Sequence, residues 1–176
     1  MIRPTFRAAL VARSLTILRV IWGALVVALF IDIAIGVWMA RRLGPAFPSD
    51  IAATLTPALY ALAIGVALVV LWWRRLLEPD RCVTGARTAS APPGLGVAPE
   101  TDSERSAVAA LARFQAHSIY VWALAELIAV VGLVMSVGVG DARHVTGLGA
   151  ASLVLLAMHA PSQRRVEAIV DAVPGR

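Results

Sequence analysis

Residues 118–140 read SIYVWALAELIAVVGLVMSVGVG, an apolar run of 23 residues that contains one carboxylate, Glu126. A helix rises 1.5 Å per residue, so about 20 residues cross the ~30 Å hydrocarbon core of a bilayer. A charge at the centre of a bilayer costs about 2.5–3.5 kcal/mol on insertion scales. The run therefore predicts a transmembrane helix in which Glu126 has a partner, a proton or a function.

The composition of the whole chain indicates a membrane protein. Hydrophobic residues make up 59% of the 176 and charged residues 15%, whereas an ordinary soluble domain has about 25% charged residues. The net charge of +5 comes from arginines that flank apolar runs, where they match anionic lipid headgroups, so we expect no nucleic-acid partner. No metal or cofactor motif is present, and the one cysteine, Cys82, is expected in a loop.

Four apolar runs predict the fold. They cover residues 20–40, 51–73, 118–140 and 145–160. The first is longer than a signal-peptide core and is expected to be retained, while the last is short and must borrow from its flanks or thin the bilayer. Gly44 and Pro45 break the chain between the first two runs. We predict an all-α integral membrane bundle of four transmembrane helices with short amphipathic flanking helices.

The segments around these runs are polar or amphipathic. Residues 1–19 form a basic amphipathic segment predicted to lie in the headgroup plane, and residues 76–102, rich in Pro, Gly, Ser and Thr, form a cytoplasmic disordered linker. Thr101-Asp102-Ser103-Glu104 is typical of a capping box, starting an amphipathic helix over 103–117 that continues into the third span. Residues 162–173 predict an amphipathic C-terminal helix that lies on the membrane or on the linker.

The distribution of arginine predicts the orientation. With the N-terminus inside, the outer turns hold only Arg41, Arg42 and Arg143, and the inner segments hold the other thirteen of sixteen. Both termini and the linker are therefore expected to be cytoplasmic. The use of Arg without any Lys fits a GC-rich bacterial genome, so we predict a multi-pass protein of the bacterial plasma (inner) membrane.

A second acid, Asp32, lies within the first run. At 1.5 Å per residue, Asp32 is ~18 Å and Glu126 ~12 Å into the core from the inner side, about one helical turn apart. If these spans touch, the two carboxylates can share a proton or a cation, and we expect at least one of them to be protonated. The candidate hydrogen-bond partners are the hydroxyls of Thr54, Thr56, Tyr60 and Ser152.

Small residues predict where helices approach closely. Asp32 belongs to a stripe of such residues spaced by four along the first span, so we expect it to face protein. The residues expected at helix contacts are Ala24, Ala28, Gly36, Ala61, Gly65, Gly132 and Ser136.

Histidine and tryptophan gather near the predicted span ends. His117 and His159 are candidates for a proton path toward Glu126 or for a two-nitrogen metal site, while the alternative is that they contact headgroups. His144 is expected at the outer surface. Tryptophans that we expect in the interfacial aromatic belt are Trp22, Trp38 and Trp122.

Residues 123–134, ALAELIAVVGLV, resemble the carboxylate helix of rotary ATPase proteolipid subunits, which carry a similar Ala-Leu-x-Glu-x-x-Ala-x-x-Gly-Leu pattern. The resemblance implies that Glu126 carries a transported proton or sodium ion. Proteolipid subunits pair this helix with a glycine-rich helix through a short polar loop. Here the second span has one glycine and the connection exceeds forty residues, so the chain as a whole is better described as a small four-span bacterial membrane protein.

Three functions follow from this sequence. The favoured one is a non-catalytic structural or accessory subunit, whose partners are the lipid bilayer and other membrane subunits or further copies of itself. The alternative is a proton- or cation-coupled translocator that uses Glu126 and Asp32. A membrane enzyme ranks last, because no nucleophile and base pair, metal motif or phosphate-binding loop is present.

Overall fold

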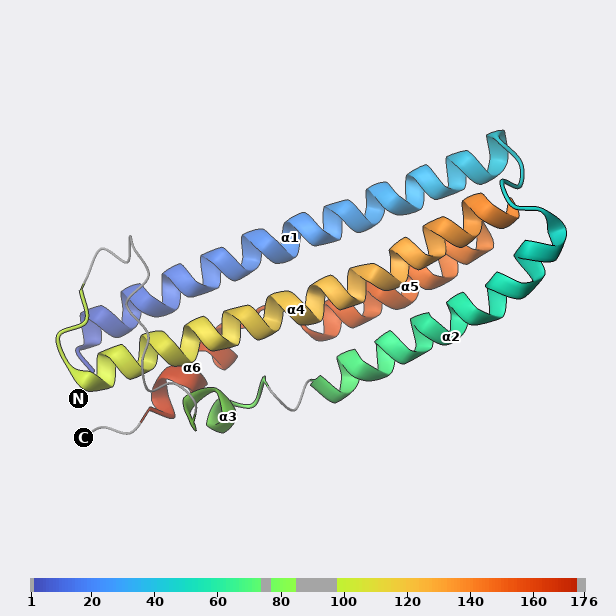
Figure 1. Ribbon diagram of the computed structural model, residues 1–176. Helices are drawn as coiled ribbons and strands as arrows, with labels where there is room; N and C mark the ends of the chain where they lie inside the picture. Colours follow the sequence, from blue (N-terminus) through green and yellow to red (C-terminus); the bar gives the residue numbers. More distant parts are fainter. Residues whose placement is uncertain (1, 74–76, 85–97, 174–176) are drawn as a thin grey trace. The chain divides into compact units, whose positions relative to one another are not determined.

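The computed structural model describes residues 2–73, 77–84 and 98–173, of which 86% are helical and none lies in a strand. The all-α prediction is confirmed for this part of the chain. Its helices, drawn in Figure 1, are α1 (Pro4–Arg42), α2 (Ser49–Trp73), α3 (Pro79–Thr84), α4 (Asp102–Val139), α5 (Arg143–Met158) and α6 (Gln163–Asp171).

Three of these helices, α1, α2 and α4, are long and apolar enough to cross a membrane. The fourth predicted span corresponds to α5, which has only 16 residues. It reaches sufficient length only if α5 and α6 count together as one bent span. The described chain therefore carries three candidate membrane spans, or up to four.

The helices α1 and α4 extend beyond the predicted spans. They contain 39 and 38 residues, which gives each a length of nearly 60 Å against a hydrocarbon core of ~30 Å. The predicted helix over 103–117 does continue into the third span without interruption. Residues 4–19 likewise belong to α1 without a break near residue 20.

Contacts divide the chain into two compact units. The terminal unit comprises Met1–Ile21, Trp73–Tyr120 and Ala160–Arg176, and the apolar unit comprises Trp22–Trp72 and Val121–His159. The first halves of α1 and α4 thus belong to the terminal unit, and their second halves belong to the apolar unit.

The terminal unit has a core of its own. The side chains of Phe6, Leu18 and Leu111 are at most 1% exposed, and the apolar face of α6 is buried in the same way. Contact between α3 and α6 places the C-terminal helix against the described part of the predicted linker, which was one of its two predicted positions. The linker residues 85–97 lie outside the described residues.

Cys82 is a core residue of the terminal unit, so its predicted place in a loop is wrong. It lies in α3 and is 1% exposed. Burial raises the pKa of the Cys82 thiol, and the charge of Arg113 opposes this change. Because the thiolate is the reactive form, the thiol is poorly nucleophilic at neutral pH.

The apolar unit is built around the second half of α4. The side chains of Trp122, Ile128 and Met135 are at most 2% exposed. By contrast, α1 and α2 expose large apolar side chains, and Trp38 and Leu68 are 58% and 61% exposed. Such surfaces are unfavourable in water but are solvated by lipid chains in a bilayer, so the burial pattern supports the membrane assignment.

The connection between α1 and α2 caps the end of α4. Gly44, with a φ of +68°, lies two residues after Arg42, the last residue of α1, which confirms the predicted helix stop. The N–H groups of Ala46 and Phe47 then donate to the carbonyls of Val137 and Gly138 at 3.1 and 2.9 Å. These carbonyls lie in the last turn of α4, where no further helical N–H exists to bond them.

Candidate intramembrane carboxylate site

The two predicted site acids lie in the same unit. Asp32 is on α1 and Glu126 on α4, and both side chains are half-buried. Asp32 lies close enough for its charge to act on Glu126. The structure therefore places both carboxylates in the apolar unit.

Neither acid has a partner within the described chain. The carboxylates of Asp32 and Glu126 make no hydrogen bond or ion pair with any residue that the structure describes. Arginine is also distant along the helices, since Arg41 is nine residues from Asp32, or ~13 Å. Any partner of these groups must come from outside this part of the chain.

The four hydroxyls predicted as partners bond elsewhere, so that prediction is wrong. Thr54 donates to the carbonyl of Asp50 at 3.1 Å, Thr56 to that of Ala52 at 2.7 Å and Ser152 to that of Ala125 at 2.6 Å, while the Tyr60 hydroxyl pairs with Nδ1 of His144 at 2.9 Å. Three of the four therefore satisfy main-chain carbonyls, which compete with a carboxylate for the same hydroxyl.

Two of the predicted packing glycines lie at close helix contacts. A Cβ on Gly36 would lie 3.0 Å from side-chain atoms of Leu133 and Val145, and a Cβ on Gly132 would lie 2.9 Å from Cβ of Leu148. These glycines let α1, α4 and α5 approach closely. Gly36 is one turn along α1 from Asp32.

The other predicted packing residues behave differently. Ala61 and Gly65 are exposed on α2, and nothing lies within 4 Å of a Cβ built on Gly65. Ala24 is exposed and Ala28 half-buried. Ser136 is buried and accepts a hydrogen bond from the N–H of Val145 at 2.8 Å, which satisfies a free donor in the first turn of α5.

The two histidines proposed for a proton path belong to different units, His117 to the terminal unit and His159 to the apolar unit. Nδ1 of each ring lies 2.8 Å from a carbonyl four residues earlier, that of Arg113 or of Leu155. Because a carbonyl oxygen only accepts, Nδ1 of each ring carries a proton. These contacts hold both imidazoles against their own backbone.

Tryptophan has a role that the sequence did not indicate. Trp122 is 1% exposed and its Nε1 donates to the carbonyl of His159 at 3.0 Å, so its predicted place in the lipid interface is wrong. Nε1 of Trp22 donates to the carbonyl of Leu156 at 3.0 Å. The two indoles thereby satisfy carbonyls at the end of α5. Trp38, in contrast, is exposed as a belt residue would be.

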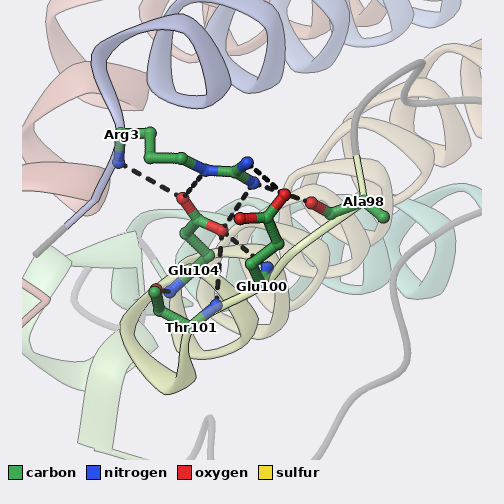
Figure 2. Close-up of polar contacts among 5 residues, drawn as sticks. All are labelled: Arg3, Ala98, Glu100, Thr101 and Glu104. Atoms are coloured by element: carbon green, nitrogen blue, oxygen red, sulfur yellow. Dashed lines mark hydrogen bonds and ion pairs between the residues drawn. The ribbon is translucent and has the colours of Figure 1, made fainter.

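A second polar cluster lies in the terminal unit (Figure 2). Glu104 is fully buried, and its carboxylate accepts from the main-chain N, Nε and Nη2 of Arg3 at 3.2, 2.8 and 3.0 Å. It also accepts from the N–H groups of Glu100 and Thr101 at 2.7 and 3.4 Å. Nη1 of Arg3 forms an ion pair with Glu100 at 2.5 Å.

This cluster contains the predicted capping box. The Thr101 hydroxyl accepts from the N–H of Glu104 at 3.2 Å while the Glu104 carboxylate accepts from the N–H of Thr101, as the motif requires. The hydrogen bond from Arg3, together with those from the main chain, holds the pKa of Glu104 at about 2, below its ordinary value of 4.5, although burial opposes the change. The sequence predicted the capping box but did not indicate that Arg3 bonds its glutamate.

One open cavity of about 550 Å³ lies in the apolar unit. Its lining is mostly apolar and is formed by Pro45, Phe47, Ser49, Ala52, Ala53, Thr56, Pro57 and Val139. Neither Asp32 nor Glu126 lines it. The candidate site at the carboxylates is therefore distinct from this cavity.

Comparison of the chain with protein-family models, with curated proteins and with solved structures gives no match. Carboxylates in an apolar setting can hold a proton, bind a cation or pair with a cationic side chain of another protein. In the described ranges, no three His, Cys, Asp or Glu side chains are arranged to hold a metal ion.

Proposed function

We propose that the protein is a non-catalytic subunit of a membrane complex, in which α1 and α4 present Asp32 and Glu126 to another membrane chain. The observation that carries the proposal is that both acids lie in apolar helices without a partner in the described chain. An uncompensated charge costs about 2.5–3.5 kcal/mol at mid-bilayer on insertion scales, and more by other measures. A neighbouring subunit would remove this cost.

The surface around the acids supports the same proposal. Ile31 and Ile35, which flank Asp32 on α1, are 52% and 43% exposed. Asp32 is therefore near side chains that contact lipid unless another protein covers them. The hydroxyl protons of Thr56 and Ser152 are donated to main-chain carbonyls, so neither hydroxyl donates to these carboxylates.

The proposed setting is the bacterial plasma membrane, with both termini cytoplasmic. Thirteen of the sixteen arginines fall on the inner side in that orientation. The terminal unit, which contains both termini, would then face the cytoplasm.

Native gels of membranes solubilised in mild detergent test the proposal. The wild-type protein should migrate in a complex larger than its 18.6 kDa chain and its detergent, and the double variant Asp32→Asn, Glu126→Gln should be released from it. Asp50→Asn, which changes an exposed acid at the start of α2, is the matched control and should leave the complex intact. A wild-type protein that migrates alone would refute the proposal.

A second candidate is a proton- or cation-coupled translocator. It is favoured by the electrostatic influence of Asp32 on Glu126 and by the proteolipid-like sequence around Glu126. Purified protein in liposomes should then conduct protons or sodium ions without any other subunit, and Glu126→Gln should abolish the flux. Absence of flux from the purified wild-type protein, together with a complex on the native gel, would favour the subunit role.

A further inference from the structure

We propose that the partner of this chain is a transmembrane helix with an Arg or Lys at mid-depth, which docks beside Asp32 and Glu126 and pairs its cation with them. The inference rests on the proposed subunit function and names the chemistry of the partner.

The charges exclude a second copy of this chain as the source of the cation. All sixteen positive residues are arginines, and none lies within residues 20–40, 51–73, 118–140 or 145–160. Every copy therefore brings two acids and no cation to the middle of the membrane. Electrostatic complementarity requires a different chain, because a further copy would add like charges.

The pairing is favourable for both proteins. A lone cation in the partner helix is as poorly solvated by lipid as a lone carboxylate is in this chain, and contact between them relieves both. Asp32 and Glu126 together carry two acidic groups for one cation. With one cation, the pair is electrically neutral when one of the two acids keeps a proton.

The surface near each acid is apolar and uncovered. Ile31 and Ile35 are exposed beside Asp32, and Leu127 and Val130 are 39% and 38% exposed beside Glu126. An apolar helix fits such a surface, and its single cation would meet the acids.

Two small residues permit the helix to approach. Ala24 and Ala28 precede Asp32 at intervals of four along α1, so they lie on the same side of that helix. Ala24 is exposed and Ala28 half-buried, in contrast to Gly36, whose surface is covered by α4 and α5. This part of the stripe is therefore left for another helix.

Model helices provide the first test. Synthetic Leu/Ala transmembrane peptides that differ only in a central Arg, Leu or Asp are added to bilayers containing the full-length protein, and association is followed by fluorescence energy transfer. The Arg peptide should bind about tenfold or more tightly than the Leu peptide, and the Asp peptide should bind least. Asp32→Asn with Glu126→Gln should abolish the preference, whereas Asp50→Asn should retain it. Equal binding of the Arg and Leu peptides would overturn the inference.

Photo-crosslinking in the native membrane provides the second test. A photoreactive residue at position 24 should capture a helix whose sequence has Arg or Lys at mid-span, and Asp32→Asn with Glu126→Gln should prevent the capture. Capture of a second copy of this chain, or of a helix without a basic residue, would overturn the inference but leave the subunit function standing. No capture together with a lone chain on the native gel would overturn both. As a control, the double variant should unfold at the same Tm as the wild type, which would show that it is folded.

Discussion

Replacement of Glu104 by Gln tests the most highly connected carboxylate in the described chain. The side chain accepts five hydrogen bonds, three of them from Arg3. Glutamine keeps the size but loses the charge, and its amide group is a donor facing other donors. A pKa of about 2 against an ordinary 4.5 corresponds to about 3 kcal/mol at about 1.4 kcal/mol per pH unit. Because the Arg3 side chain is 34% exposed and screened by water, we expect a loss of about 2–3 kcal/mol.

Thermal unfolding in detergent, followed by circular dichroism at a helix band, measures this loss. About 2–3 kcal/mol should lower Tm by roughly 5–10 °C in a chain of this size. The matched control is Asp102→Asn in the same turn, where the carboxylate is 95% exposed and 3.6 Å from Arg105. Its effect should be about 0.5 kcal/mol or less. Equal losses in the two variants would refute the reasoning, since burial would then have no consequence.

The same pair of proteins predicts a pH dependence. The pKa of Glu104 is lowered on folding, so its stabilisation is fully present above about pH 4.5 and is lost as the pH falls toward 2. The difference in Tm between the wild type and Glu104→Gln should therefore shrink over this range. A difference that stays constant from pH 6 to pH 2.5 would contradict the assignment.

Three further substitutions are tested by the same unfolding measurement. Gly132→Ala places a Cβ 2.9 Å from that of Leu148 and should cost about 1–3 kcal/mol; an unchanged Tm would show that α4 and α5 are not closely packed. Ser136→Ala leaves the buried N–H of Val145 without its acceptor and should cost about 1–3 kcal/mol, and a neutral result would contradict this capping role. Gly65→Ala has open space and should raise stability by up to about 1 kcal/mol; a lower Tm would indicate that Gly65 packs against a helix after all.

Local signals in the sequence predicted much of the helical framework. Apolar runs of about 20 residues indicate helices that can cross a bilayer, whatever the rest of the chain does. Gly44 marks the stop of α1, and Thr101 with Glu104 marks the start of α4, because both motifs act within a few residues. The acids of the candidate site were equally visible, since a charge inside an apolar run stands out.

The surroundings of those residues were not predictable in the same way. Hydropathy does not distinguish a tryptophan that faces lipid from one that faces protein, so Trp122 was assigned to the wrong environment. Hydropathy also does not indicate whether a hydroxyl bonds a carboxylate on another helix or a main-chain carbonyl of its own helix. Thr56 does the latter. Cys82 was similarly placed in a loop because its burial depends on other helices.

The sequence by itself determined that this is a helical protein for an apolar environment, and it located the two acids within that environment. Only the tertiary structure decided that Arg3 bonds Glu104, 101 residues away, and that the hydroxyls expected to pair with Asp32 and Glu126 bond elsewhere. The physical reason is that helix formation and membrane burial depend on neighbours within a few turns. Ion pairs, caps between helices and uncovered surfaces depend on which helix faces meet.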